Sequence, residues 1–478
     1  MTISNESTVA PLKIAIIGGG IAGLAAAMGV LKHQKEGANV EVVIYEAAHE
    51  FKEIGAGVSF GPNAQRALHM IGLGNELDSI SGGDPGGSES DDVWFDVYVG
   101  EKQTVKSERE MICKVEGKDS AKGSVHRADF LNKMANLVPE PVKHLNHRCS
   151  SYETILSEEG ENAGGKVLLR FAETTDQNGN KFTPEDVKVD VVLASDGIKS
   201  LMRKCLYKRR GLDGALEKYS GWIAWRGLID QAEYHDIMGK DASTKLLLLG
   251  QDKHILTFPI KHGKVVNLVI MIIKGSEITL DRSPRIDPNP NFWRTKPHSM
   301  RNTWLFLRYV SLDNLSNEQK FNLCIALFLK AIEDPSIWGI FDLPVLEHTI
   351  DHHLALIGDS AHATTPHQGA GAGQAVEDSL FITAILCSPV VCSAPLTERS
   401  AKVQKALELY AKVRHTRGGK VQTTSAEAGK LYEFNEVNGE GKDLEKIKQN
   451  LIHRMGWIWD WDVEAELKTA LKELEELC

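Results

Sequence analysis

The sequence predicts an α/β protein that opens with a β-α-β unit on a parallel sheet, carries an inserted mixed sheet, and ends in a helical region. Three observations predict this. First, an apolar run at 14–17 precedes an Ala- and Leu-rich stretch at 21–31 and a β-branched run at 40–45. Second, strand-like runs crowd between residues 219 and 273. Third, the residues beyond 401 have a largely helical pattern.

Length and composition limit the classes of protein that fit. The chain has 478 residues, which is longer than a domain with a single hydrophobic core usually is. Two domains and a tail are therefore expected. A net charge of -10 argues against a nucleic-acid partner. We see no signal peptide in 1–12, and glycines interrupt the apolar stretch 14–30, so we predict no membrane span. Scattered cysteines without CxxC spacing favour a cytoplasmic protein with reduced thiols.

The first loop fits the GxGxxG dinucleotide fingerprint, because it follows a strand and opens a helix. Gly18 permits the tight turn, and Gly20 lets the backbone approach a pyrophosphate. Gly23, one residue after Ala22, lets the helix pack closely. Glu46 ends the next strand and is expected to accept hydrogen bonds from ribose hydroxyls. These five residues are candidates for binding the cofactor, but the fingerprint does not separate FAD from NAD.

The remaining elements follow in chain order. We predict loops at 81–90 and 282–297, where Gly, Ser, Pro or Asn are frequent. The predicted strands are 92–99, 187–194, 222–228, 245–249, 255–260, 265–272 and 354–357. The predicted helices are 370–386, 402–431 and 444–477. The strands between 222 and 272 suggest a separate sheet that forms the floor of a substrate chamber.

Two later motifs carry a family resemblance. Residues 191–203 read VVLASDGIKSLMR and residues 354–374 read LALIGDSAHATTPHQGAGAGQ. With the first fingerprint, their order and spacing over 13–386 resemble the class A flavoprotein monooxygenases, the para-hydroxybenzoate hydroxylase-like family. Within it, the fungal salicylate hydroxylase-like proteins are the most similar.

The resemblance implies a domain plan with a Rossmann-like FAD-binding domain of the GR2 type. The expected ranges are 1–80, 126–215 and 311–400 for three parts of the FAD domain, 81–125 for a variable loop and sheet segment, 216–310 for the substrate-binding sheet, and 401–478 for the helical region.

The resemblance also implies tightly but non-covalently bound FAD. In it, Asp359 would hold a ribityl hydroxyl and Pro366 would lie near the flavin ring. Gly369, Gly371 and Ala372 would let the backbone pass close under the ring. The helix that follows would direct its N-terminus at the ring, where it stabilises the anionic reduced flavin by roughly 0.3–2 kcal/mol.

Three further residues match the family's cofactor contacts. Asp196 would serve both FAD and the incoming nicotinamide, although Asp-Gly is also an ordinary turn. Arg127, in the segment SVHRAD, would contact FAD; the alternative is a surface arginine at a helix start. Gly57 would contact FAD from the loop after the acidic strand end.

The reaction that the resemblance implies uses NADH or NADPH as a transient co-substrate and O2. Reduced FAD would form a C4a-hydroperoxide, and a small phenolic acid would take up the distal oxygen. Salicylate hydroxylase would add the oxygen at the carboxyl-bearing carbon and release carbon dioxide. The alternatives are another flavin monooxygenase of the same fold, a dearomatising phenol hydroxylase or an epoxidase. No metal is required.

Two residues of the middle sheet are candidates for the chemistry. A phenol reacts best as phenolate, so the pocket needs a cation or a base. Arg226 would pair either with a substrate anion or with an internal carboxylate, because an unpaired buried arginine is costly. His254 is either a base or a satisfied histidine of the core or rim. Phe258 stands before Pro259 where many relatives have tyrosine, which weakens the dearomatising alternative.

The tail contains a tryptophan-rich segment, 457–462, and an amphipathic stretch, 464–477. Tryptophans at this place are expected to pack on the body or on a partner subunit. The amphipathic stretch offers a subunit contact, and with it a homodimer.

Overall fold

The computed structural model describes residues 9–51, 57–81, 91–100, 110–155, 166–175, 180–213, 216–273, 317–332 and 335–478, without the side chains of 317–320. The predicted loop at 282–297, and all but the first residue of the loop at 81–90, lie outside these ranges. Within them, no helix is both long and apolar enough to cross a membrane.

The first sheet is the predicted parallel one. Its strands, in spatial order, are β19 (Ile350–Asp351), β20 (Leu354–Leu356), β13 (Val191–Ala194), β1 (Leu12–Ile17), β2 (Val40–Tyr45) and β7 (Lys143–His144). All neighbours are parallel except β19 and β20. Strands β13 and β20 are apolar along their length, and so is β1 apart from Lys13, as expected for strands covered on both faces.

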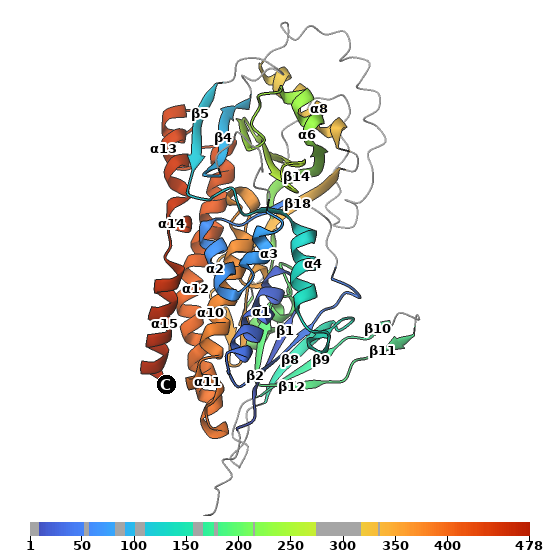
Figure 1. The fold of residues 1–478 in the computed structure, drawn as a ribbon, viewed down its shortest axis with the longest axis vertical. Coiled ribbons are helices and arrows are strands. Elements are labelled where there is room, and N and C mark those ends of the chain that lie inside the picture. The colour runs from blue at the N-terminus through green and yellow to red at the C-terminus, as the bar shows by residue number, and fades with distance from the viewer. Residues whose placement is uncertain are drawn as a thin grey trace, which may run out of the picture.

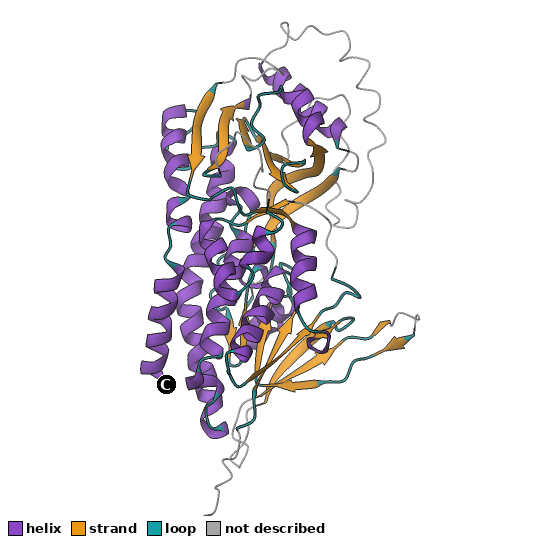
Figure 2. Cartoon of the chain, in the orientation of Figure 1, coloured by secondary structure: helices purple, strands orange, loops and turns teal. Residues whose placement is uncertain are grey.

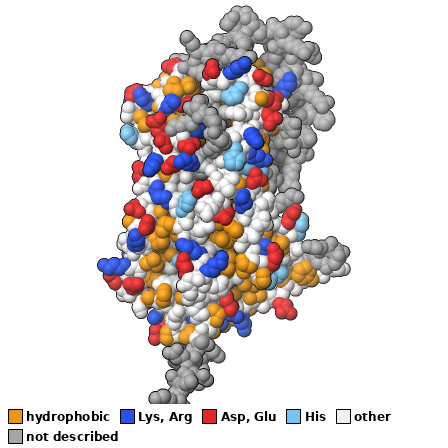
Figure 3. Space-filling model, viewed as in Figure 1, with side chains coloured by type: hydrophobic (Ala, Val, Ile, Leu, Met, Phe, Trp, Pro, Cys, Tyr) orange, Lys and Arg blue, Asp and Glu red, His pale blue; other side chains and the backbone are white. Residues whose placement is uncertain are grey.

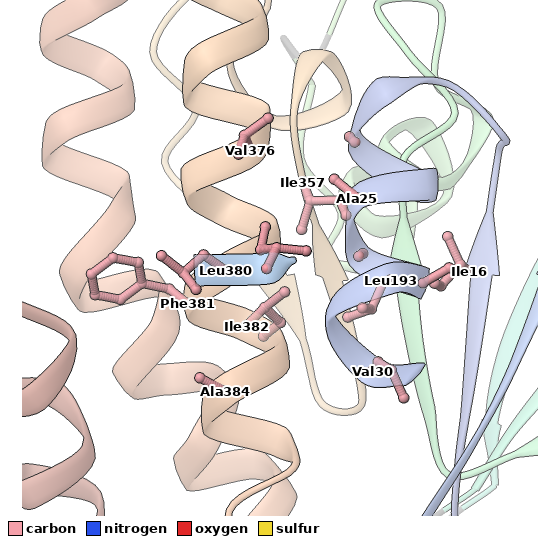
Figure 4. Close-up of a cluster of buried hydrophobic side chains, with 14 of the residues drawn as sticks. Ile16, Ala25, Val30, Leu193, Ile357, Val376, Leu380, Phe381, Ile382 and Ala384 are labelled. Carbon is pink, nitrogen blue, oxygen red and sulfur yellow. The ribbon is translucent and has the colours of Figure 1, made fainter. Parts of the chain in front are cut away.

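Helices cover one face of this sheet (Figures 1 and 2). They are α1 (Ile21–Lys35), α2 (Pro62–Ile71), α3 (Gly74–Asp78), α4 (Arg127–Leu137) and α10 (Gly371–Leu386). Figure 4 shows their packing: Ala25 and Val30 of α1 lie between the strand residues Ile16 and Leu193 and the α10 residues Val376 and Leu380. This core fixes the starts of α1 and α10 relative to the strand ends.

The other face of the sheet carries a second, smaller core. It packs against a three-stranded sheet of β8 (Cys149–Ile155), β9 (Lys166–Phe171) and β12 (Val187–Val189), and against helix α5 (Leu201–Arg209). Two short ribbons complete this part: β3 (Gly57–Ser59) with β6 (Ser124–His126), and β10 (Thr174–Thr175) with β11 (Lys181–Phe182).

The predicted middle sheet has seven strands. In spatial order they are β18 (Ser336–Asp342), β14 (Lys218–Asp230), β17 (Val265–Ile273), β16 (Lys253–Ile260), β15 (Leu246–Gly250), β4 (Val93–Val99) and β5 (Met111–Glu116). Helices α6 (Gln231–Met238) and α8 (Asn317–Ala331) contribute to the core on one of its faces. We expected residues 216–310 to form this sheet. Strands β4 and β5 from the segment 81–125, and strand β18 from the segment 311–400, also belong to it.

The C-terminal region runs along one side of the molecule (Figure 1). Its elements are α11 (Pro389–Cys392), α12 (Leu396–Tyr432), α13 (Leu444–Arg454), α14 (Gly456–Trp459) and α15 (Val463–Leu477). On the face in Figure 3, acidic and basic side chains are interspersed rather than gathered by sign. The remaining elements are α9 (Asp359–His362), η6 (Pro366–Gln368) and η2 (Glu140–Val142).

Two sequence predictions about element boundaries were wrong. The strand predicted at 187–194 is interrupted at Asp190, which accepts a hydrogen bond from the backbone N–H of Lys13 (2.8 Å), so its two halves join different sheets. The helix predicted at 444–477 is three helices. The carboxylate of Asp462 caps α15 by accepting from the N–H of Ala465 (3.0 Å), which ends the preceding turn there.

The tail packs on the body. Trp459 stacks on Trp94 with 4.5 Å between ring centroids, and Trp461 stacks on Phe381 at 5.5 Å. The apolar face of α15, which includes Leu467 and Leu474, is part of the main core. The face that we offered as a subunit contact is therefore used within the chain, and the homodimer stays a prediction.

Candidate cofactor and substrate site

One large cavity lies between the two sheets, with a volume of about 2270 Å³. Pockets for a single small ligand have roughly 300–1,000 Å³, so this cavity has room for a dinucleotide and a second molecule. All but one of the predicted site residues line it: Gly18, Gly20, Ala22, Glu46, Gly57, Arg127, Asp196, Arg226, His254, Asp359, Pro366, Gly369, Gly371 and Ala372. The remaining one, Gly23, lies behind the wall.

The fingerprint glycines have three different surroundings. Gly18 has φ +102°, which only glycine adopts readily, and a Cβ there would lie 2.5 Å from the carbonyl oxygen of Ser195. A Cβ on Gly23 would lie 2.0 Å from the carbonyl oxygen of Gly18, so α1 can approach the turn only without a side chain. A Cβ on Gly20 would meet nothing within 4 Å, because that position faces the cavity.

The start of α1 is suited to an anion. Gly20 is its N-cap and supplies no side-chain hydrogen bond to the first turn. Free N–H groups and the helix dipole at such an end attract phosphate. Glu46 lies beside it and accepts from the backbone N–H of Gly19 (2.6 Å) and of Ala48 (2.7 Å). The carboxylate is thereby fixed at the rim of the cavity, where a ribose would reach it.

Asp196 has a structural task in addition to lining the cavity. Its carboxylate accepts from the Ser200 hydroxyl (2.6 Å) and from the backbone N–H groups of Leu201 (2.7 Å) and Met202 (3.1 Å) at the start of α5. Burial raises the pKa of Asp196, and these hydrogen bonds oppose that rise. The sequence left open whether Asp196 belongs to an ordinary turn or to the cofactor site. The two alternatives are compatible, because the carboxylate that caps α5 also borders the cavity.

The second loop presents an exposed carboxylate to the cavity. Asp359 follows Gly358, whose φ of +61° turns the chain at the end of β20. The backbone N–H of Gly358 donates to the buried carboxylate of Asp378 (2.8 Å), so α10 holds this turn from behind. The Asp359 side chain is thus left facing the cavity from the start of α9.

A buried ionic network links this turn to the C-terminal region. Arg414 of α12 donates to Asp378 (2.8 Å) and to Glu377 (2.6 Å), and all three side chains are almost fully enclosed. Arg417 donates to Glu377 (2.8 Å) and its guanidinium lies 4.0 Å from the ring centroid of Trp461. The tryptophan-rich tail therefore packs on the cations that hold the second loop.

The residues of the cavity fit FAD at both ends. The glycine turn and the uncapped start of α1 suit a pyrophosphate, and Glu46 suits a ribose. Asp359 offers an acceptor for a hydroxyl group opposite them. Gly369, which has φ +58°, and Gly371 border the same cavity, and neither has a side chain to obstruct a planar ring.

One face of the middle sheet lines the part of the cavity where we predicted the substrate. Arg226 pairs in register with Val269, which pairs with Leu256, and His254 lies two residues before Leu256 on the same face. The Cα atoms of Arg226 and His254 lie two strands apart across the sheet and two residues apart along it, which places them roughly 12 Å from each other. That distance leaves room for one aromatic ring between the two side chains.

Arg226 has no anionic partner among the described residues. Its Nε is enclosed and makes no hydrogen bond. Burial, and to a smaller extent the charge of Arg127, lowers the pKa of Arg226 from 12.5 to about 10. The internal carboxylate that the sequence allowed is not present in the described part of the chain, so the cation is available to a ligand.

His254 is both satisfied and exposed to the cavity. Its Nδ1 lies 3.1 Å from Glu433 Oε1, and burial lowers its pKa from 6.5 to about 3. Its Nε2 has no partner within the described chain and is not among the fully enclosed polar atoms, so it meets the cavity. His254 therefore fits both alternatives of the sequence analysis. Its Nδ1 is satisfied, as in a histidine of the core or rim, and its Nε2 meets the cavity, as a base would.

Gly57 and Arg127 border the same region. The N–H of Gly57 donates to the Asn267 side chain (2.8 Å) on the middle sheet, and a Cβ on Gly57 would lie 2.5 Å from the Phe258 ring. Gly57 is thereby held against the middle sheet at the border of the cavity. Arg127 begins α4 beside it.

Sequence reasoning missed two residues of the site. His367 in η6 lines the cavity, and neither of its ring nitrogens has a partner among the described residues. Glu433 reaches His254 from the end of α12, far away in the sequence. His367 stands inside the motif that we used for FAD and could have been noticed there. Glu433 is part of no motif, and only the fold brings it to the cavity.

Comparisons with known proteins agree with this geometry. The sequence matches no protein-family model. It is 31% identical to a salicylate hydroxylase of Pseudomonas putida over 97% of this chain and 95% of the relative. It is 30% identical to an FAD-dependent monooxygenase of Aspergillus niger over 97% of both chains. A solved salicylate hydroxylase substrate complex superposes with a TM-score of 0.72, 30% identity, and coverage of 96% and 98%.

Proposed function

Because this chain belongs to the salicylate hydroxylase-like FAD-dependent monooxygenases, we propose that it hydroxylates a small phenolic acid with NAD(P)H and O2. The observation that carries the proposal is the single cavity shared by the glycine turn, the Asp359 loop and the unpaired Arg226. A cofactor and an anionic aromatic ring can thus lie side by side in it.

The chain's own residues hold and orient FAD. The start of α1 binds the pyrophosphate, Glu46 the ribose, and Asp359 a hydroxyl of the ribityl chain. When bound and reduced by NAD(P)H, FAD activates O2 and delivers one oxygen atom to the substrate. The backbone at Gly369 and Gly371 would border the ring, and the start of α10 would favour negative charge on it.

The middle sheet binds the substrate. Arg226 pairs with the substrate's carboxylate or phenolate, which supplies the counter-charge that no described residue provides. His254 Nε2 meets the same cavity and is available to the phenol hydroxyl. Apolar side chains such as Leu256 and Val269 cover the ring and exclude water.

The proposed reaction is decarboxylative. An ortho-hydroxyl raises the electron density of the ring carbon that bears the carboxylate. If that carbon takes up the oxygen, its bond to the carboxylate breaks, carbon dioxide leaves, and catechol forms. Phe258 lacks the hydroxyl that would hold a phenolate from a second side, which favours this outcome over dearomatisation.

A panel of phenols tests the proposal. The FAD-loaded protein is incubated with salicylate, 3-hydroxybenzoate, 4-hydroxybenzoate and phenol, and NADH and NADPH oxidation is measured together with product mass. We expect salicylate to accelerate oxidation and to give catechol. If no phenol accelerates the oxidation of either nucleotide, the hydroxylase function is wrong.

A further inference from the structure

A carboxylate from the C-terminal region is buried behind the substrate end of the cavity. Glu433 is the C-cap of α12, and its side chain is 0% exposed. Its Oε2 accepts from Trp222 Nε1 (2.8 Å), and its Oε1 lies 3.1 Å from His254 Nδ1. Both of its oxygens are therefore engaged by residues of the middle sheet.

No lysine or arginine in the described chain neutralises this carboxylate. The titratable groups around it are His254 from β16, His367 from η6, Tyr432 from α12, and Asp252 from the turn before β16. Burial, opposed by the Trp222 hydrogen bond and reinforced by Asp252, raises the pKa of Glu433 to about 8. Burial also lowers the pKa of both histidines. The carboxyl group is thus the one that titrates near neutral pH.

The protonation state of Glu433 decides which nitrogen of His254 carries the proton. When Glu433 is protonated, its O–H donates to Nδ1 and the histidine proton is on Nε2. When Glu433 is ionised, it accepts from Nδ1–H, and Nε2 presents a lone pair to the cavity. Only the second state can accept a proton from a ligand.

We propose that Glu433 is a positioning residue that keeps the His254 proton on Nδ1, so that Nε2 takes the hydroxyl proton of the bound phenol. This inference rests on the proposed phenolic substrate. The phenol O–H bond breaks and an N–H bond forms on Nε2. The oxygen keeps the electron pair as phenolate. The ionised Glu433 carboxylate beside Nδ1 opposes the burial that lowers the pKa of His254 and so stabilises the imidazolium. Arg226 supplies a positive charge on the other side of the ring.

The test uses the full-length, FAD-loaded Glu433→Gln variant. The amide oxygen replaces the acceptor for Trp222, while the amide N–H donates to Nδ1 and keeps the histidine proton on Nε2. We expect kcat/KM for salicylate to fall by about 100-fold or more, the range of a lost general base. The wild-type rise of kcat/KM through about pH 8 should disappear. Glu436→Gln, an exposed position three residues on, is the matched control and should retain both.

A second readout does not depend on turnover. The ultraviolet difference spectrum of bound salicylate reports phenol or phenolate, and flavin fluorescence reports its Kd. We expect phenolate in the wild type above pH 8, phenol in Glu433→Gln, and Kd values within about threefold of each other. If the wild type binds salicylate as phenolate yet oxidises no NAD(P)H, the proposed function is wrong while the proton transfer stands.

Two results would overturn the inference. One is a Glu433→Gln protein with the wild-type pH profile. The other is a parallel loss of FAD and salicylate affinity, which would make Glu433 a structural residue. Should that variant fail to fold, Trp222→Phe removes the hydrogen bond that lowers the pKa of Glu433 and keeps an aromatic ring at this buried position. The pH rise should then move to higher pH, and an unmoved profile refutes the proposal.

Discussion

Replacement of Arg226 by methionine should affect folding and ligand binding in opposite directions. Arg226 is partly buried on β14, its Nε is enclosed, and it has no anionic partner among the described residues. Its pKa lies at about 10 instead of 12.5, which corresponds to roughly 3 kcal/mol against the charged form. At pH 7 the side chain is charged in both the folded and the unfolded chain, so this free energy opposes folding.

Arg226→Met removes that cost and keeps most of the side-chain volume. We therefore expect the free energy of unfolding of the ligand-free protein to stay equal or to rise, by up to about 3 kcal/mol. Salicylate should bind more weakly by about 1.5–3 kcal/mol, the contribution of a hydrogen bond to a charged group. That range corresponds to an increase in Kd of about 10- to 150-fold.

Urea unfolding followed by fluorescence measures the first quantity, and flavin fluorescence titration with salicylate measures the second. Lys218→Met is the matched control, because it removes an exposed cation from the same strand. It should change neither quantity. A large loss of stability in Arg226→Met, with unchanged salicylate affinity, would show that the arginine has a structural partner and would refute the reasoning.

Three other substitutions test the cofactor end. Asp359→Ala should raise the Kd for FAD by about 10- to 150-fold and yield colourless protein; a full complement of flavin in the variant would remove Asp359 from the site. Gly23→Ala places a methyl group 2.0 Å from the Gly18 carbonyl oxygen and should lower both stability, by about 1–3 kcal/mol, and flavin content. Arg414→Leu removes the cation that Glu377 and Asp378 share and leaves them only Arg417 and His362, so it should cost about 3–5 kcal/mol in urea unfolding, whereas Lys412→Leu on the exposed side should cost little.

Local sequence patterns predicted the fold correctly where one short segment of the chain determines the structure. The β-α-β start follows from the apolar run 14–17, the glycine turn and the β-branched run 40–45, and the structure confirms all three elements. Strands β14 to β17 were also found within a few residues of their ends, since their apolar and β-branched residues are continuous. The loop around Asp359 was recognised because its glycines are closely spaced.

Contacts between distant segments could not be read from patterns. The break at Asp190 depends on the backbone of Lys13, and the membership of β18 in the middle sheet depends on pairing with β14. The contact of Glu433 with His254 joins residues 179 positions apart. The residues next to Glu433 and His254 in the sequence contain no pattern that indicates this contact. The sequence therefore predicted most residues that we assign to the cavity, including Arg226 and His254, but not Glu433, which contacts His254 from a distant segment.

The central claim is that this cavity transfers oxygen from O2 to a phenolic ring. It is tested most directly by turnover of the FAD-loaded protein with salicylate and NADH or NADPH under 18O2. The account predicts one labelled oxygen atom in each catechol and one equivalent of nucleotide consumed. Unlabelled product, or nucleotide oxidation that yields only hydrogen peroxide with every phenol tried, would contradict it.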